Sequence, residues 1–227
     1  MTILAEILEF FTGCLEFFTG CEEFKDFGIN RKTFIVLSLA TLIMLRIVSH
    51  GSQAHKIWTE RSGEAVSTTW FLNLIFVRLG TMFYGIHANG FLTVLNGCTF
   101  PAAIINTWVL IKHRGVRIEG LLLGIYTISC ASLIAVSQNE KAIETTFFFL
   151  NVGNLVSAAT QPFLMWREKS RGVVQIKMVQ VHILLSAAWT MYGFVVLKRT
   201  ALGTTSLLFT AIFVIAHVLW CRYKKTA

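Results

Sequence analysis

Two related stretches decide the fold of this chain, QAHKIWTERS at residues 53–62 and QPFLMWREKS at residues 161–170. They stand 108 residues apart, agree at four of ten positions, and each carries a basic residue directly after its glutamate. Without any gap, the same offset places Tyr84-Gly85 on Tyr192-Gly193. The correspondence therefore runs from the end of one apolar segment through the next, and it indicates two copies of one structural unit.

The composition restricts what this unit can be. Of the 227 residues, 55% are hydrophobic and 14% are charged, and the mean hydropathy is +0.64. Soluble domains carry about 25% charged residues, so the chain belongs to the membrane class and is not disordered. The net charge of +8 comes from short basic clusters between apolar stretches. Such clusters are typical of loops at an anionic membrane surface, and we expect no nucleic-acid partner.

Seven apolar segments are long enough to span a membrane, which takes about 20 residues for a helix. Their residues do not alternate in polarity as the strands of a membrane β-barrel do, so all seven are predicted to be helices. The predicted spans are residues 33–50, 66–87, 91–111, 117–137, 143–164, 174–197 and 202–221.

The repeat predicts how these spans are arranged. Each copy holds three spans, and because three is odd, two copies joined directly would point in opposite directions through the bilayer. A single linker span returns the chain to the starting side, which predicts parallel copies in a 3+1+3 arrangement with a central site between them. The predicted parts are an acidic, amphipathic interfacial segment at 1–32, a three-helix bundle at 33–112, a linker helix at 113–140, and a second three-helix bundle with a short basic tail at 141–227.

Lysine and arginine are distributed unequally between the two predicted sides. The side of the C-terminus holds twelve of the twenty, and the other side holds six. The positive-inside rule then places the N-terminus outside or in a lumen and the C-terminus in the cytosol. The acidic leading segment lacks the basic start of a secretory signal, so no cleaved leader is expected. It repeats LEFFTGC at residues 8–14 and 15–21, which favours a helix lying at the interface.

In these motifs the chain resembles the SWEET sugar transporters and the wider PQ-loop superfamily, over about residues 33 to 222. The resemblance is carried by the two Gln-x(4)-Trp-x-Glu-basic-Ser stretches, by Tyr84-Gly85, by Asn96 and by Trp189-Thr-Met-Tyr192-Gly193. It implies the 3+1+3 fold and a sugar site lined by Asn96 and Trp189. The candidate hinges are Gln53 and Gln161 of the two repeated stretches and Pro162, since proline removes a helix hydrogen bond.

The chain departs from the family pattern at four positions. Ser52 and Thr160 replace the prolines of the two Pro-Gln dipeptides, and Thr81 stands where the first copy would carry its tryptophan. Thr204 stands where the second copy would carry its asparagine. Thr204 is therefore the candidate counterpart of Asn96.

Arginine is the one charged residue type placed well inside the predicted spans. Arg78 lies near the middle of its span, where a guanidinium costs at least ~2.5–3.5 kcal/mol, so it should face the interior. It offers paired donors to a substrate carboxylate, or it bonds backbone carbonyls at a helix break. Arg46 lies closer to a span end and is expected to reach the membrane surface. Tyr84, with Trp189, could stack on a sugar ring, and Tyr192 completes the candidate substrate-binding residues.

These features predict a facilitative transporter of a small polar solute, in the first place a sugar, that works by alternating access between the two bundles. Facilitated diffusion without proton coupling is expected, because the spans hold no acid in their interiors and proton relays in membranes are usually built from Asp, Glu or His chains. Two alternatives stay open: a PQ-loop-type exporter of amino or organic acids, and a receptor of the same fold that binds a peptide carboxylate.

No catalytic motif or phosphate-binding loop occurs in the sequence, so an enzyme is not expected. The sequence predicts neither a metal nor another cofactor. The expected partners are the solute and the lipid bilayer, and a homo-oligomer is left open.

Overall fold

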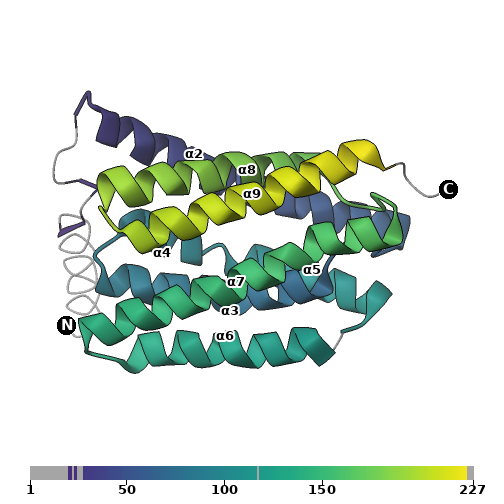
Figure 1. Ribbon diagram of the computed structural model, residues 1–227, viewed down its shortest axis with the longest axis horizontal. Coiled ribbons are helices and arrows are strands. Elements are labelled where there is room, and N and C mark those ends of the chain that lie inside the picture. Colours follow the sequence, from purple (N-terminus) through teal and green to yellow (C-terminus); the bar gives the residue numbers. More distant parts are fainter. Residues whose placement is uncertain (1–19, 22, 25–27, 117, 224–227) are drawn as a thin grey trace, which may run out of the picture.

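A computed structural model of the protein describes residues 20–21, 23–24, 28–116 and 118–223. In this part of the chain all regular structure is helical, and no strand occurs. The helices lie side by side in one elongated bundle (Figure 1). Most of the predicted interfacial segment, and all of its seven-residue repeat except residues 20 and 21, lie outside the described residues.

Each predicted span is helical to within a few residues of its ends, and the third is divided between two helices. The bounds are α2 Arg31–Glu60, α3 Thr68–His87, α4 Phe91–Gly97, α5 Phe100–Arg114, α6 Ile118–Val136, α7 Glu140–Glu168, α8 Ile176–Met191 continued by the π-helix η1 Tyr192–Val196, and α9 Thr200–Arg222. Six of these stretches are long and apolar enough to cross a membrane, if α4–α5 and α8–η1 are each taken as one. The chain thus has the build of a multi-pass membrane protein.

Helix α7 is the predicted span that does not belong to these six. Its 29 residues exceed the length that a membrane requires. Its inner side, however, carries the buried polar residues Asn154, Ser157 and Gln161, which lower its hydropathy. These side chains face other helices, whereas the apolar Phe149, Val156 and Phe163 are exposed on the outer side of α7.

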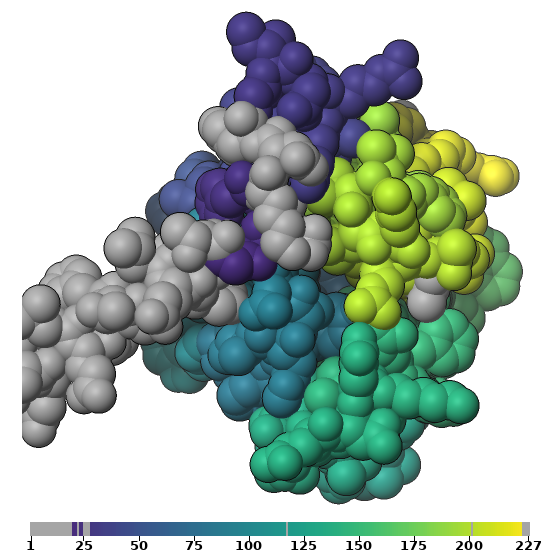
Figure 2. Space-filling model, turned by 90° about the vertical axis from the view of Figure 1, so that its left-hand side faces the viewer, coloured from purple at the N-terminus to yellow at the C-terminus, as the bar shows by residue number. Residues whose placement is uncertain are grey.

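For description we call α2, α3 and α4–α5 the first group of helices, and α7, α8–η1 and α9 the second group. In the first group α5 packs against both α2 and α3, and in the second group α9 packs against both α7 and α8. The groups meet where α2 packs on α8 and where α3 packs on α7, and α6 lies against α3 and α7. We call the end that carries residues 61–67, 169–175 and the C-terminus of α9 the basic end. The opposite end carries residues 88–90, 137–139 and 197–199 and is viewed in Figure 2.

The backbone repeats as well as the packing order. Arg61 ends α2 and Lys169 ends α7, both in the left-handed conformation, with φ of 48° and 51°. Asn89 and Lys198 precede α4 and α9 with φ of 49° and 53°. The first pair is 108 residues apart and the second is 109 apart, because the π-helix η1 inserts one residue into the second group.

Both Tyr-Gly pairs of the sequence lie where two helices approach closely. A Cβ atom on Gly85 would lie 2.7 Å from the backbone nitrogen of Val94, and one on Gly193 would lie 2.6 Å from that of Gly203. Only glycine permits these approaches, because real Cβ atoms do not come so near to backbone atoms. The glycines therefore set the spacing between α3 and α4 and between η1 and α9.

Replacement of Gly85 by alanine should lower the stability of the bundle by about 1–3 kcal/mol, because the new methyl group overpacks against the α4 backbone. Gly51 on α2 is the matched control, since nothing lies within 4 Å of its Cβ position. Gly51→Ala should leave the melting temperature in detergent unchanged or raise it, as alanine favours helix. A Gly85→Ala variant that melts at or above the wild-type temperature would contradict the close approach.

Candidate functional site

A cavity of about 80 Å³ lies between the two helix groups. It can hold several water molecules or a small solute, since one water needs about 10–15 Å³. Both groups contribute to its wall. The first supplies Arg46, Arg78, Thr81, Thr93 and Asn96 among others, and the second supplies Asn151, Asn154, His182, Ser186, Trp189 and Ser206.

Two arginines converge on one amide oxygen in this cavity. Nη1 of Arg46 donates to Oδ1 of Asn96 at 2.6 Å, and Nη1 of Arg78 donates to the same atom at 2.8 Å. Nη2 of Arg46 also donates to Oγ1 of Thr99 and, at 3.4 Å, to the backbone carbonyl of Asn96. Arg46 is thereby held on three sides. Among the described residues, Arg78 has one hydrogen bond, and the rest of its guanidinium lines the cavity.

The break between α4 and α5 creates the acceptors for Arg46. Pro101 follows Phe100, the first residue of α5, and it has no N–H to donate to the carbonyl of Gly97. The chain therefore leaves α4 after Gly97, and Thr99 turns back so that its hydroxyl donates to the Asn96 carbonyl at 2.6 Å. A helix end with available oxygens is thus placed in the middle of the bundle.

No carboxylate of the described residues neutralises the charges of these two arginines. Their side chains are only 2% and 9% exposed, yet neither forms an ion pair with any described residue. The ion pairs of the described residues involve Arg114, Arg167 and Arg199 instead. Because two buried positive charges repel strongly in a medium of low dielectric, the cavity favours a negatively charged occupant.

The location predicted from the sequence agrees with the structure for Arg78 but not for Arg46. Arg78 faces the interior, as expected. The expectation that Arg46 reaches the membrane surface is wrong, because α2 runs on to Glu60 and Arg46 lies at its middle. A residue at this depth cannot reach either helix end with its side chain.

The other predicted substrate-binding residues lie in different places. Trp189 lines the cavity. Tyr84 is stacked on Phe147 with ring centroids 3.7 Å apart, outside the cavity wall. Tyr192 is fully buried, and its hydroxyl donates to Oε1 of Glu23.

Thr204 is exposed on α9, away from the cavity. The residue inserted by η1 shifts the register of α9 by one position, so the structural counterpart of Asn96 is the buried Thr205. An ungapped comparison of the two copies could not reveal this shift.

Sequence reasoning missed much of the cavity wall in the second group. Asn154 and Ser186 both line the cavity, and they stand 108 residues after Arg46 and Arg78. The repeat offset applied to the two arginines would have found both residues. His182 has no such signal, because the residue 108 positions before it is Leu74.

The basic end is closed by two glutamines, each of which binds a loop of the opposite group. Gln53 of α2 accepts from the Gln175 backbone N–H at 2.7 Å and donates to the Val173 carbonyl at 3.1 Å. Gln161 of α7 accepts from the Ser67 backbone N–H at 3.0 Å and donates to the Ala65 carbonyl at 2.6 Å. We call these four bonds the glutamine clasp, and donors and acceptors correspond at an offset of 108.

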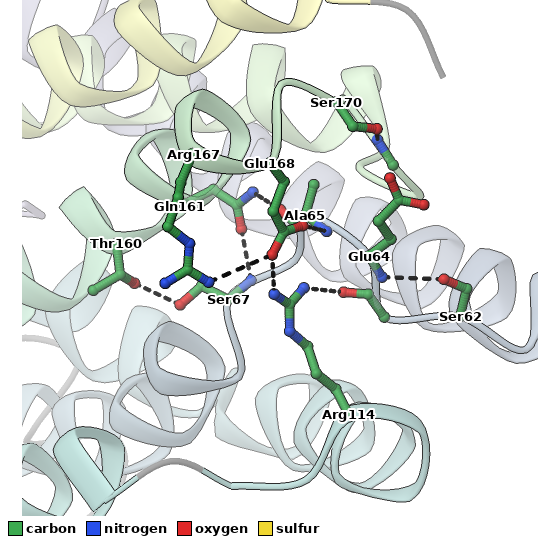
Figure 3. A network of polar contacts seen from close by, with 12 residues as sticks. Ser62, Glu64, Ala65, Ser67, Arg114, Thr160, Gln161, Arg167, Glu168 and Ser170 are labelled. Atoms are coloured by element: carbon green, nitrogen blue, oxygen red, sulfur yellow. Dashed lines mark hydrogen bonds and ion pairs between the residues drawn. The ribbon is translucent and has the colours of Figure 1, made fainter. Parts of the chain in front are cut away.

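Further polar contacts surround the Gln161 half of the clasp (Figure 3). Glu168 of α7 pairs with Arg114 of α5 and accepts from the backbone N–H of Ala65 at 2.8 Å. Arg114 also donates to the Gly63 carbonyl at 2.7 Å. Figure 3 shows Arg114 reaching from the first group toward Glu168 of the second, so the contacts tie both groups together at this end.

The predicted hinge residues lie inside continuous helices. Gln53 is within α2, and both Gln161 and Pro162 are within α7. The motion that a hinge requires stays a prediction.

At the opposite end a smaller cavity shares Phe147 and Asn151 with the central one and extends toward Arg199. The buried side chain of Glu23 lies at this end as well, and its Oε1 accepts from the Leu92 backbone N–H at 2.9 Å. Burial, and then the charge of Glu23, raise the pKa of the nearby Cys21 thiol to about 11. Because Leu92 of the first group and Tyr192 of the second both donate to Glu23, the two groups are also joined at this end.

No protein-family model, no curated protein and no solved structure matches this chain. The likeness to SWEET and PQ-loop proteins therefore stays a resemblance carried by its own residues.

Replacement of Asn96 by alanine should destabilise the protein by about 1–3 kcal/mol or more, because both guanidiniums lose their shared acceptor inside the bundle. A residue that only binds solute could instead be replaced with little loss of stability. Asn151→Ala is the control, since Asn151 lines the same cavity but its described bond goes to the Phe147 carbonyl of its own helix. Equal melting temperatures of the two variants would argue against the shared oxygen.

Loss of the clasp should loosen the basic end. In a Gln53→Ala/Gln161→Ala variant, the backbone amides of Ser67 and Gln175 lose their acceptors, so their hydrogen exchange should become several-fold faster, as about 1 kcal/mol per bond implies. Gln180→Ala on the exposed side of α8 should leave both rates unchanged. Unaltered exchange in the double variant would exclude the clasp.

Proposed function

We propose that this chain is a membrane transporter that carries a small solute with an anionic oxygen group, such as a carboxylate, by alternating access between its two helix groups. The observation that carries this proposal is the pair of buried guanidiniums at the cavity, which have no carboxylate partner among the described residues. A bound carboxylate would supply the missing charge and accept two parallel N–H bonds from Arg78.

Several observations support a 3+1+3 arrangement of the two groups. The packing order is the same in both, the clasp is reciprocal at an offset of 108, and the left-handed residues recur in corresponding places. In this arrangement α6 is the linker helix. The distribution of lysine and arginine supports a cytosolic basic end.

Alternating access also has a physical basis in these contacts. Polar bonds join the groups directly at the basic end and through Glu23 at the opposite end, and the cavity lies between the groups. Opening one end requires breaking only the bonds at that end, while the helices within each group can stay packed. The proposed motion is a rocking of one group against the other about the cavity.

The geometry favours an anion over the neutral sugar that the resemblance implies. Oδ1 of Asn96, which would otherwise accept from a sugar hydroxyl, already accepts from two arginines. Trp189 remains available for an apolar or ring-shaped part of the solute. The organic-acid and amino-acid alternative is therefore the preferred substrate class.

A receptor for a peptide carboxylate would use the same two arginines, so a test must measure movement as well as binding. Uptake of lactate, glutamate and citrate into proteoliposomes is compared with that of glucose and lactamide, which carry no negative charge. The proposal expects at least one carboxylate to be taken up selectively. Binding without uptake would instead support a receptor, and selective uptake of glucose would support a sugar transporter.

Two substitutions test the role assigned to the guanidiniums. Arg78→Lys should weaken carboxylate binding about tenfold or more at a similar melting temperature, because an ammonium does not reproduce the planar fork. Asn96→Asp should raise the melting temperature and abolish carboxylate uptake, since a built-in carboxylate then occupies the site. Arg167→Lys, at a side chain that is 45% exposed, should change neither the melting temperature nor the uptake of carboxylate. Undiminished uptake by the Asn96→Asp variant would refute the proposed site.

A further inference from the structure

Two histidines face each other at the joint between the helix groups. His50 lies on α2 and His182 on α8, with their Nε2 atoms 3.3 Å apart and their rings stacked at a centroid distance of 5.2 Å. The two residues are 2% and 5% exposed. His182 also lines the cavity that holds the two arginines.

The hydrogen bonds of the pair assign its protons. Nδ1 of His182 lies 2.8 Å from the Met178 carbonyl, which can only accept, so this nitrogen carries a proton. In a neutral ring Nε2 of His182 is then an acceptor, and Nε2 of His50 must donate to it. Nδ1 of His50 is left with a bare lone pair, and it is buried without a hydrogen-bond partner. The pair can therefore take up one more proton at this atom.

Filling space does not require histidines here. The positions related by the offset of 108 are Ala158 for His50 and Leu74 for His182, on the matching joint between α7 and α3. Both are buried and belong to one apolar cluster. The same place in the fold is thus made by apolar side chains in one half and by a proton-binding pair in the other.

The charged groups that face the pair are both positive. They are Arg46 of α2 and Arg78 of α3. The other elements around the pair contribute neutral groups among the described residues: Trp70 and Phe71 of α3, Asn106 of α5, whose Nδ2 donates to the His50 carbonyl, and Phe213 of α9. With the cavity empty, two guanidiniums oppose a third positive charge on the pair. An anion held by Arg78 cancels part of that field, so anion and proton favour each other's binding.

We propose that the His50–His182 pair binds one proton together with each anion that enters the cavity, so that the transporter moves an anion and a proton in the same direction. The inference rests on the proposed function, because the anion at Arg78 supplies the coupling. The proton enters from water on one side and leaves to water on the other, and no covalent bond of the solute changes. Proton coupling would then not require acids inside the spans, because the histidine pair binds the proton.

The test measures binding of the carboxylate with the highest affinity among lactate, glutamate and citrate to the purified full chain, between about pH 5.5 and pH 7.5, where histidine titrates. For coupled binding of one proton, the affinity should rise by up to about tenfold for each unit by which the pH falls. Calorimetry in buffers of different ionisation enthalpy should show uptake of about one proton per anion. A wild-type affinity that changes less than about twofold over this range would overturn the proposal.

The variant His50→Ala/His182→Leu copies the apolar pair of the other half and should fold. It should bind the carboxylate with little dependence on pH and without proton uptake. In proteoliposomes it should exchange labelled carboxylate but fail to accumulate it under an inward proton gradient, which the wild type should do. Should the double variant not fold, His182→Gln provides the same comparison.

The control is His55→Ala, at an exposed histidine of the same helix, which should retain the full pH dependence. A pH dependence that persists in the folded double variant would also overturn the proposal. If no carboxylate binds at any pH, both the proposed function and the proton coupling are refuted. Carboxylate binding that depends on Arg78 but not on pH refutes the coupling alone.

Discussion

The arrangement around the cavity follows from the need to hold two guanidiniums deep in an apolar bundle, where no described carboxylate pairs with them. Each buried charge is costly unless its N–H groups find acceptors. The protein provides these by interrupting its third span, so that Asn96 and Thr99 present a side-chain amide, a hydroxyl and a backbone carbonyl at one point. Three features position these acceptors beside the guanidiniums. They are the break at Pro101, the packing of α4 on α3 and the close approach at Gly85.

The two helix groups share backbone features and helix contacts, but they carry different residues at the cavity. Arg46 corresponds to Asn154, and Arg78 corresponds to Ser186. The frame-setting features recur in both halves: the glutamine clasp, the Tyr-Gly pairs and the left-handed residues at helix ends. Positive charge is therefore concentrated on one wall of the cavity, and a bound solute would be oriented with its anionic end toward the first group.

The sequence predicted the spans well because long apolar runs leave few alternatives to a helix in lipid. It also predicted that Arg78 faces inward, since the depth of that residue is clear from its span. Arg46 was misplaced because the apolar run around it ends ten residues before the helix does, at Glu60. The polar residues after position 50 continue α2, and Gln53 among them binds the opposite group. A hydropathy pattern cannot show a partner that is distant in the sequence.

Two other features of the site depend on tertiary structure in the same way. The register of α9 depends on the single residue that η1 inserts, so Thr205 rather than Thr204 lies at the Asn96 position. The His50–His182 contact joins residues 132 positions apart, and the offset of the repeat gives no hint of it because the corresponding residues are apolar. Local pattern and internal symmetry thus predict the frame of this protein but not where its two halves differ.

The polar inner side of α7 has a consequence for how the chain is assembled during synthesis. A helix with buried Asn154, Ser157 and Gln161 is poorly soluble in hydrocarbon by itself. Its partners α3 and α6 precede it in the chain, and Asn73 of α3 donates to the Ser157 hydroxyl at 2.8 Å. When α7 leaves the ribosome, a surface that can accept its amides is already embedded in the bilayer. The order of the helices along the chain therefore allows the polar side of α7 to be covered as soon as this helix is made.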